Sequence, residues 1–341
     1  MNSTDNETCL FLEVLFIAQV SPAVHYTALF TSIINGLTSL SAILGNSVML
    51  YVFLKTRTLQ TPSNMLLGSL CITDLIVGLI VQPLGIVRRI IEANKQHNCP
   101  VRIVYACFGF LCSGASFLNV GLISVDRCLA LHMPFRYMRI ASNSRHLIII
   151  SLVWLFWAVF TVLPFCSVLS ASSFFSVVVG VLGINVLVIL VCYALIARMV
   201  LQLKRTFVAA TSLGALDTSA DTMPGSSGVG KSSTVSAASA LKASDDDHKK
   251  AEKRHNYTIF IVVACFVVCY IPQMTVLFLR SAFGDNVSLV FIADAWVDTL
   301  TFINSSLNPI IYCLRSNEIR RHVLRSLGVR RTSVVPANHM A

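Results

Sequence analysis

Charged side chains are scarce in this chain. Only 12% of its 341 residues are Asp, Glu, Lys or Arg, whereas 55% are hydrophobic, and the mean hydropathy is +0.74. In a typical soluble domain, about a quarter of all residues are charged. The scarcity therefore excludes a soluble enzyme or binding module and indicates an integral membrane protein.

Acidic residues are rarer than basic ones, with 16 Asp and Glu against 26 Lys and Arg and a net charge of +10. A basic protein can bind nucleic acid, but most of these basic residues fall on one side of the membrane topology predicted below. Such an excess marks the cytoplasmic side, near anionic lipid. We therefore expect an extracellular N-terminus, a cytoplasmic C-terminus and no nucleic-acid partner. The basic residues on the opposite side are Arg88, Arg89, Lys95, Arg102 and Arg280.

Long polar stretches are also scarce. Seven segments of 20 or more mostly apolar residues could each cross a bilayer as a helix. They predict an all-α fold, with a seven-helix transmembrane domain over residues 28–314. The predicted spans are residues 28–54, 63–87, 103–131, 146–165, 173–203, 257–279 and 287–314.

The segment before the first span has no basic region followed by a cleavable apolar core. We therefore expect no signal peptide, an extracellular tail over residues 1–27, and a first span that serves as the signal anchor. Three asparagines lie in N-x-S/T motifs and are expected to carry glycans on the extracellular side. They are Asn2, Asn6 and Asn286.

The longest loop, residues 207–247, is rich in Ser, Ala, Thr and Gly and is predicted to be disordered cytoplasm. Its letters from Gly225 to Ser232 match the G-x-x-x-x-G-K-S nucleotide-binding pattern. No buried strand precedes them and no apolar-faced helix follows, so we do not expect nucleotide binding. Residues 315–327 form a basic amphipathic stretch, predicted to lie along the inner membrane surface at the start of a cytoplasmic tail, 315–341.

Polar residues of the last span fall on one helical face, because steps of three and four residues return to the same side. Pro309 lies within this span, where it bends the helix and frees a carbonyl that a neighbouring polar group must satisfy. Polar side chains are costly against lipid, so the face is expected to line an interior holding water or an ion. Its members are Asp294, Asp298, Thr301, Ser305, Asn308 and Tyr312.

The sequence Asn308-Pro309-Ile310-Ile311-Tyr312 resembles the seventh-helix signature of rhodopsin-like (class A) G-protein-coupled receptors. The alternative is a small transporter or channel that uses the polar groups around Asp74. That alternative predicts a polar stripe on several helices, whereas polarity fades in the fourth and fifth spans. The resemblance implies a seven-helix receptor in the plasma membrane.

Asp74 is a lone carboxylate within the second span, where an ionised acid is costly unless it is protonated or holds a cation. The resemblance implies an allosteric sodium ion and water at Asp74, in a network that collapses on activation, and no other cofactor. The residues of this predicted network are Asn46, Asp74, Ser116, Asn304, Ser305, Asn308, Pro309 and Tyr312.

At the inner end of the third span, Asp126-Arg127-Cys128 resembles the family's Asp-Arg-Tyr switch, with cysteine in place of tyrosine. The resemblance implies that Arg127 is held at rest by carboxylates and meets a tyrosine of the fifth span when active. Such a pair adds little stability but fixes one geometry. The predicted G-protein switch comprises Asp126, Arg127, Glu252, Tyr193, Pro134 and Phe135.

In the sixth span, Pro272 kinks the helix so that its inner half can swing. The predicted lever is Phe266, Tyr270 and Pro272, and Tyr270 stands where the family usually has tryptophan. The predicted ligand pocket is apolar, with charged residues at its mouth that either neutralise one another or anchor a ligand's charged end. Its candidates are Phe110, Ser113, Phe117, Tyr270, Gln273, Leu277, Asp294, Asp298, Arg88 and Arg280.

Two departures from the family narrow the resemblance. Arg102 occupies the site of the usual loop-bonded cysteine, and Asn185 that of the usual fifth-span proline. These features resemble the branch of melanocortin, lysophospholipid, cannabinoid and adenosine receptors. Cys99 and Cys166 could form an outer disulfide or could both be free. The amine-binding aspartate would fall at Gly109, which disfavours a monoamine ligand.

The sequence therefore predicts a receptor rather than an enzyme. It is expected to transmit the binding of an extracellular lipid-like or peptide ligand to a heterotrimeric G protein by an outward swing of the sixth helix. Arrestin and receptor kinases are further expected partners, together with the lipid bilayer.

Overall fold

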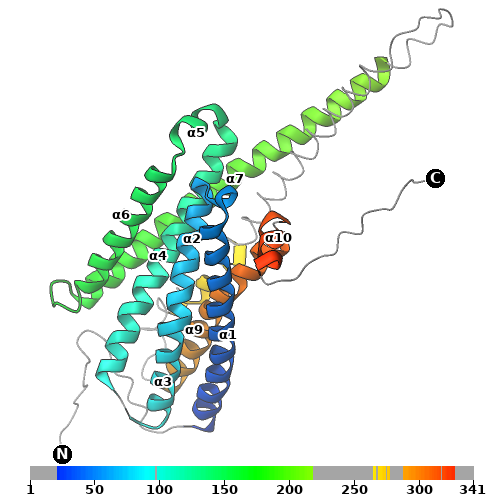
Figure 1. Ribbon diagram of the computed structural model, residues 1–341. Helices are drawn as coiled ribbons and strands as arrows, with labels where there is room; N and C mark the ends of the chain where they lie inside the picture. Colours follow the sequence, from blue (N-terminus) through cyan, green and yellow to red (C-terminus); the bar gives the residue numbers. More distant parts are fainter. Residues whose placement is uncertain are drawn as a thin grey trace, which may run out of the picture.

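The computed structural model describes residues 21–96, 98–217, 264–265, 268–273, 275–276, 287–315 and 317–326, and these contain helices without strands. Most of the helices run side by side along the long axis of the bundle (Figure 1). The helices are α1 (Pro22–Lys55), η1 (Arg57–Leu59), α2 (Pro62–Ile76), η2 (Val77–Val81), α3 (Gln82–Ala93), α4 (Cys99–His132), α5 (Pro134–Ile140), α6 (Asn143–Val162), α7 (Ala171–Asp217), α9 (Val287–Arg315) and α10 (Asn317–Ser326).

The first five predicted spans and the seventh overlap these helices. Five helical segments in the described part of the chain are long and apolar enough to cross a membrane, by length and composition alone. Helix α9 covers the predicted seventh span, and α10 covers most of the predicted amphipathic stretch. The predicted third loop starts later than expected, because α7 continues to Asp217. Most of the predicted sixth span lies outside the described residues.

Helices α2, η2 and α3 form one continuous span with a wide π turn in its middle. Pro83 lies at the start of α3 and has no N–H to donate, so a regular ladder cannot pass through it. The π turn before it absorbs the register change. Ser39 of α1 donates its hydroxyl to the Gly78 carbonyl within the π turn at 2.8 Å, which satisfies that carbonyl away from water.

Two glycines allow close approaches between helices. A Cβ atom on Gly45 of α1 would lie 2.8 Å from Cγ of Pro309, so α1 and the kinked α9 pack as closely as they do because this side chain is missing. A Cβ atom on Gly114 of α4 would lie 1.7 Å from the Trp157 indole. Trp157 fills that space and donates its Nε1–H to the Phe110 carbonyl at 2.6 Å. Helices α1 with α9 and α4 with α6 are thereby held in register.

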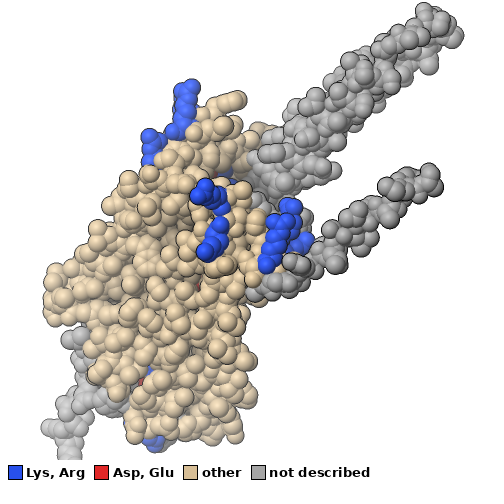
Figure 2. Space-filling model, viewed as in Figure 1, with Lys and Arg blue, Asp and Glu red and all other residues tan. Residues whose placement is uncertain are grey.

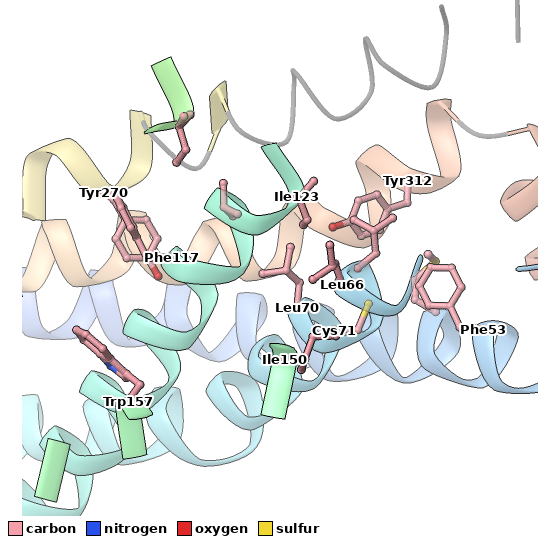
Figure 3. Close-up of a cluster of buried hydrophobic side chains, with 14 of the residues drawn as sticks. Phe53, Leu66, Leu70, Cys71, Phe117, Ile123, Ile150, Trp157, Tyr270 and Tyr312 are labelled. Carbon is pink, nitrogen blue, oxygen red and sulfur yellow. The ribbon is translucent and has the colours of Figure 1, made fainter. Parts of the chain in front are cut away.

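The main core lies around α4, which contacts α2, α3, α5, α6 and α7. Figure 3 shows part of this core, in which Leu66 and Leu70 of α2 point toward Ile123 of α4 and Tyr312 of α9. Large apolar side chains on the outer faces of α1, α6 and α7 are exposed, as a bilayer requires. In Figure 2, Lys and Arg gather around α5 and α10, and only a small basic patch lies at the opposite end.

Candidate functional site

The predicted network centres on Asp74, which is 2% exposed. Asn308 of α9 donates Nδ2–H to Oδ2 of Asp74 at 2.8 Å, and the Ser305 hydroxyl also hydrogen-bonds the carboxylate. Among the described residues no Lys, Arg or His forms an ion pair with Asp74. The carboxylate therefore joins α2 to α9 through neutral donors only.

Asn46 satisfies the carbonyl that Pro309 frees. Proline at position 309 has no N–H for the carbonyl four residues earlier, which belongs to Ser305. Asn46 of α1 donates Nδ2–H to this Ser305 carbonyl at 3.1 Å and to the Ala42 carbonyl at 2.9 Å. The kink is thus stabilised by an amide from another helix, as an apolar environment demands.

Ser116 reaches the network indirectly. It donates to Oγ1 of Thr73 at 2.7 Å, one residue before Asp74, rather than to the carboxylate itself. Around this point the side-chain oxygens of Asn46, Asn304 and Asn308, and the Tyr312 hydroxyl, are buried without a hydrogen-bond partner in the part of the chain that is described. Buried polar atoms of this kind usually bind water or an ion.

Groups of three or more His, Cys, Asp or Glu that could hold a metal are absent from the described residues. A cation at this site would therefore rely on one carboxylate together with amide and hydroxyl oxygens. Oxygen donors of this kind suit a hard cation and do not suit zinc.

Asp126, near the C-terminal end of α4, is the centre of a second polar cluster. Its carboxylate accepts hydrogen bonds from the hydroxyls of Ser63 and Tyr137, at 2.5 and 2.8 Å, and lies 3.0 Å from Nε2 of His146. Arg127 is the predicted partner, and its Nη2 lies 3.4 Å from Oδ2. The sequence analysis identified Asp126 and Arg127 but missed these other partners, which come from α2, α5 and α6.

Helix α5 begins with Pro134 and carries Phe135, which is 85% exposed. The same helix carries Tyr137, whose burial raises its pKa, as does the neighbouring Asp126 charge. Tyr137 therefore stays protonated at neutral pH and can donate to that carboxylate. Helix α5 thus presents an apolar side chain outward while anchoring Asp126 inward.

Tyr193 of α7 lies near Arg127 and Ser124 of α4. The structure thus brings Tyr193 to the predicted switch. Several other predicted residues lie outside the described part of the chain. These are Glu252, Phe266, Leu277, Arg280, Asn2, Asn6 and Asn286.

Apart from the charged residues at its mouth, the predicted pocket has its described residues on α4 and in 268–273. Phe117 and Tyr270 meet edge to face with ring centroids 5.6 Å apart, and they face each other in Figure 3. Tyr270 also hydrogen-bonds Ser113, one turn from Phe117. Phe110 packs edge to face against Phe174 of α7 at 5.3 Å. This part of the bundle is rich in aromatic side chains, and its polar side chains include Ser113, Gln273 and Asn185, whose amide donates to the Phe117 carbonyl at 2.6 Å.

The charged residues at the mouth neutralise one another. Asp298 accepts hydrogen bonds from Arg88 at 3.0 Å and Arg89 at 2.7 Å, and from the Tyr105 hydroxyl at 3.0 Å. Glu92 pairs with Arg102, and the three arginines lie within one cluster. Of the two alternatives for these charges, the contacts favour mutual neutralisation. Sequence reasoning missed Glu92 and Tyr105.

Neither alternative given above for Cys99 and Cys166 holds, because the two do not pair with each other and only one of them is free. Cys166 is a free, exposed thiol in the connection between α6 and α7. Cys99 is disulfide-bonded, so it has another partner. Beside it in α4, the Arg102–Glu92 ion pair ties α4 to α3 near the position where the family resemblance places a cysteine.

The sequence matches the protein-family model described as 7 transmembrane receptor (rhodopsin family) over residues 45–173 and 167–312. The alpha-1A adrenergic receptor of Oryzias latipes is 25% identical over 334 residues, covering 92% of this chain and 69% of that protein. The alpha-1A adrenergic receptor of Bos taurus is 27% identical, covering 97% of this chain and 73% of that protein.

A shorter match joins 125 residues, 37% of this chain, to 30% of the 5-hydroxytryptamine receptor 1A-beta of Takifugu rubripes at 31% identity. A solved structure of squid rhodopsin superposes with a TM-score of 0.68 at 21% identity, covering 91% of this chain and 87% of that one. These matches confirm the seven-helix fold. They do not confirm the melanocortin, lysophospholipid, cannabinoid and adenosine branch.

Proposed function

This chain belongs to the rhodopsin family of seven-transmembrane receptors, and we propose that it couples an extracellular apolar ligand to a heterotrimeric G protein through the Asp74 network and the Asp126–Arg127 switch. As a member of this receptor family, it is a multi-pass protein of the plasma membrane. It is not an enzyme. The uneven distribution of basic residues supports an extracellular N-terminus and a cytoplasmic C-terminus.

The observation that carries the proposal is the hydrogen bond from Asn308 to Asp74, buried between α2 and α9 beside the Pro309 kink. A buried carboxylate bound only by neutral groups is costly, and proteins keep such a group where its charge is used. A movement of α9 would break this contact, so the carboxylate can report the conformation of the bundle.

A sodium ion fits the residues around Asp74. The carboxylate would supply the charge, and the oxygens of Asn304 and Asn308 that have no hydrogen-bond partner among the described residues would supply neutral ligands of the hard type. Ser116 and Ser305 add hydroxyl oxygens nearby. A bound cation would neutralise Asp74 and favour the arrangement in which α2 and α9 remain in contact.

Activation in this proposal moves the cytoplasmic half of the sixth helix outward about Pro272. Tyr270 lies between that proline and Phe117 of α4, so a ligand beside Phe117 acts directly on the lever. Release of Arg127 from Asp126 then lets it meet Tyr193 and the G protein, while Phe135 contacts the G protein from α5. Receptor kinases and arrestin are further proposed partners.

The ligand we propose is lipid-like or a short apolar peptide. The adrenergic receptors among its relatives would suggest an amine, but Gly109 has no side chain, and a Cβ atom there would meet only Val81 at 3.9 Å. Asp298 of α9 is an alternative acid, and it is already bound by two arginines and Tyr105. An ammonium group would have to displace these partners.

The test is a second-messenger panel for cyclic AMP and calcium in transfected cells, with lipid and peptide libraries. The proposal predicts a ligand-dependent signal that Arg127→Ala abolishes at equal surface expression. As a matched control, Arg136→Ala alters an arginine of α5 for which no ion pair to Asp126 is found, and it should retain the signal. A signal that survives Arg127→Ala would contradict the proposed switch.

A further inference from the structure

Asp126 is held mainly by side chains other than its neighbour Arg127. Ser63 and Tyr137 donate to it at 2.5 and 2.8 Å, and Nε2 of His146 lies 3.0 Å from Oδ1. Arg127 lies 3.4 Å from Oδ2, the longest of the four distances. The resting hold on Arg127 therefore depends on how strongly the other partners engage the same carboxylate.

The His146 ring lies between two acceptors. Its Nε2 faces the Asp126 carboxylate, and its Nδ1 lies 3.1 Å from the Ser142 carbonyl. A neutral imidazole has one N–H and can donate to only one of them, whereas the imidazolium donates to both. The surroundings of His146 are thus fully hydrogen-bonded only when the ring carries a positive charge.

The charged and titratable groups that face this ring come from two other helices. Helix α4 contributes Asp126 and Arg127, and α5 contributes Tyr137, whose pKa is raised by burial. Ser63 of α2 is uncharged. Arg145 on the same helix donates to the carbonyls of Arg139 and Ile140, at 3.5 and 3.0 Å. In the described part of the chain, the cations that share Asp126 are therefore Arg127 and protonated His146.

We propose that protonation of His146 loosens Arg127 from Asp126, so that basal coupling to the G protein rises as cytoplasmic pH falls. A second cation beside one carboxylate weakens its attraction for the first cation and repels that cation directly. Histidine changes charge within about pH 5 to 8, which includes cytoplasmic values. His146 is a positioning residue in this account, which rests on the proposed role of Arg127.

The functional test measures nucleotide exchange on a panel of heterotrimeric G proteins by the full-length receptor in lipid vesicles, without ligand. Basal exchange by the wild type should rise about threefold from about pH 7.5 to about pH 6, the scale of one partly exposed ion pair. His146→Phe should be low and independent of pH, because the ring can no longer donate. His146→Arg should be high and independent of pH.

His132→Phe is the matched control, since His132 is an exposed histidine at the same end of α4. It should keep the wild-type pH slope, and it also reports any pH response of the G protein itself. A His146→Phe receptor with the wild-type slope, or a wild type without one, would overturn the proposal while leaving the receptor function intact.

A second measurement does not depend on coupling. Ring ¹⁵N NMR of labelled receptor at about pH 6 identifies His146 by the signal lost in His146→Phe. We expect both ring nitrogens to be protonated in the wild type, since the Ser142 carbonyl and the Asp126 carboxylate can both accept from the ring. A neutral His146 ring in the wild type would overturn the inference even if exchange were normal. Absence of exchange on every heterotrimer would instead overturn the proposed function, and the inference with it.

Discussion

Two carboxylates that lie between the same two spans have opposite kinds of partner. Asp298, toward the outer end of α9, is bound by Arg88, Arg89 and Tyr105. Asp74, in the middle of α2, is bound by neutral Asn308 and Ser305, and oxygens beside it have no partner in the described residues. An acid that is already paired with arginines contributes to the stability of the fold, whereas an acid without a cationic partner can bind a cation when one is available.

The same Asp→Asn change should therefore have different effects at the two positions. Asp298→Asn removes the carboxylate that pairs with Arg88 and Arg89. Breaking a largely buried ion pair of this kind costs about 3 kcal/mol. Thermal unfolding of the purified receptor in detergent should show a clearly lower midpoint. Gln96→Ala, at an exposed site beyond α3, is the control and should leave the midpoint unchanged. An unchanged midpoint for Asp298→Asn would remove the structural role of the cluster.

Asn46→Ala tests the hydrogen bond that supports the kink. The substitution leaves the Ser305 carbonyl without its donor, next to a proline that cannot supply one, at a cost of about 2 kcal/mol. The same unfolding assay should place this variant between Asp298→Asn and the wild type. Thr31→Ala is a matched control in α1, since among the described residues its hydroxyl bonds only carbonyls of its own helix. Equal effects of both variants would show that the freed carbonyl is satisfied in another way.

Asp74→Asn should have the smallest effect on stability. An amide oxygen can still accept the Asn308 hydrogen bond, and the buried charge disappears, so the free energy of unfolding should change by less than about 1 kcal/mol or rise. The measurement uses sodium-free buffer, where a cation cannot contribute. A loss comparable to that of Asp298→Asn would mean that Asp74 has a structural ionic partner.

Much of the fold could be predicted because hydropathy and helical spacing are local properties. The lengths of the apolar runs gave the spans, and Pro309 alone implied a freed carbonyl. The donor for that carbonyl, Asn46, lies 259 residues away from Ser305, so only the packing of α1 against α9 could identify it. The extension of α7 to Asp217 was missed because its residues look like those of a loop.

Of the residues in the polar clusters, most of those predicted from the sequence were the ones that match motifs of the receptor family. Ser63, Tyr137 and His146 are ordinary residues near predicted helix ends, and nothing in their spacing points to Asp126. Glu92 and Arg102 lie ten residues apart and meet only because α3 and α4 turn back on each other. The sequence left open whether Cys99 and Cys166 form a disulfide, because spacing alone cannot identify a cysteine's partner; Cys166 is free and Cys99 is bonded to another cysteine.

The account depends most on Asp74 as the responsive carboxylate. Its direct test is the unfolding midpoint of wild type, Asp74→Asn and Asp298→Asn in sodium chloride and in choline chloride at equal ionic strength. The account predicts that sodium raises the midpoint of the wild type and of Asp298→Asn, but not that of Asp74→Asn. An equal sodium response in Asp74→Asn, or no response in the wild type, would contradict it.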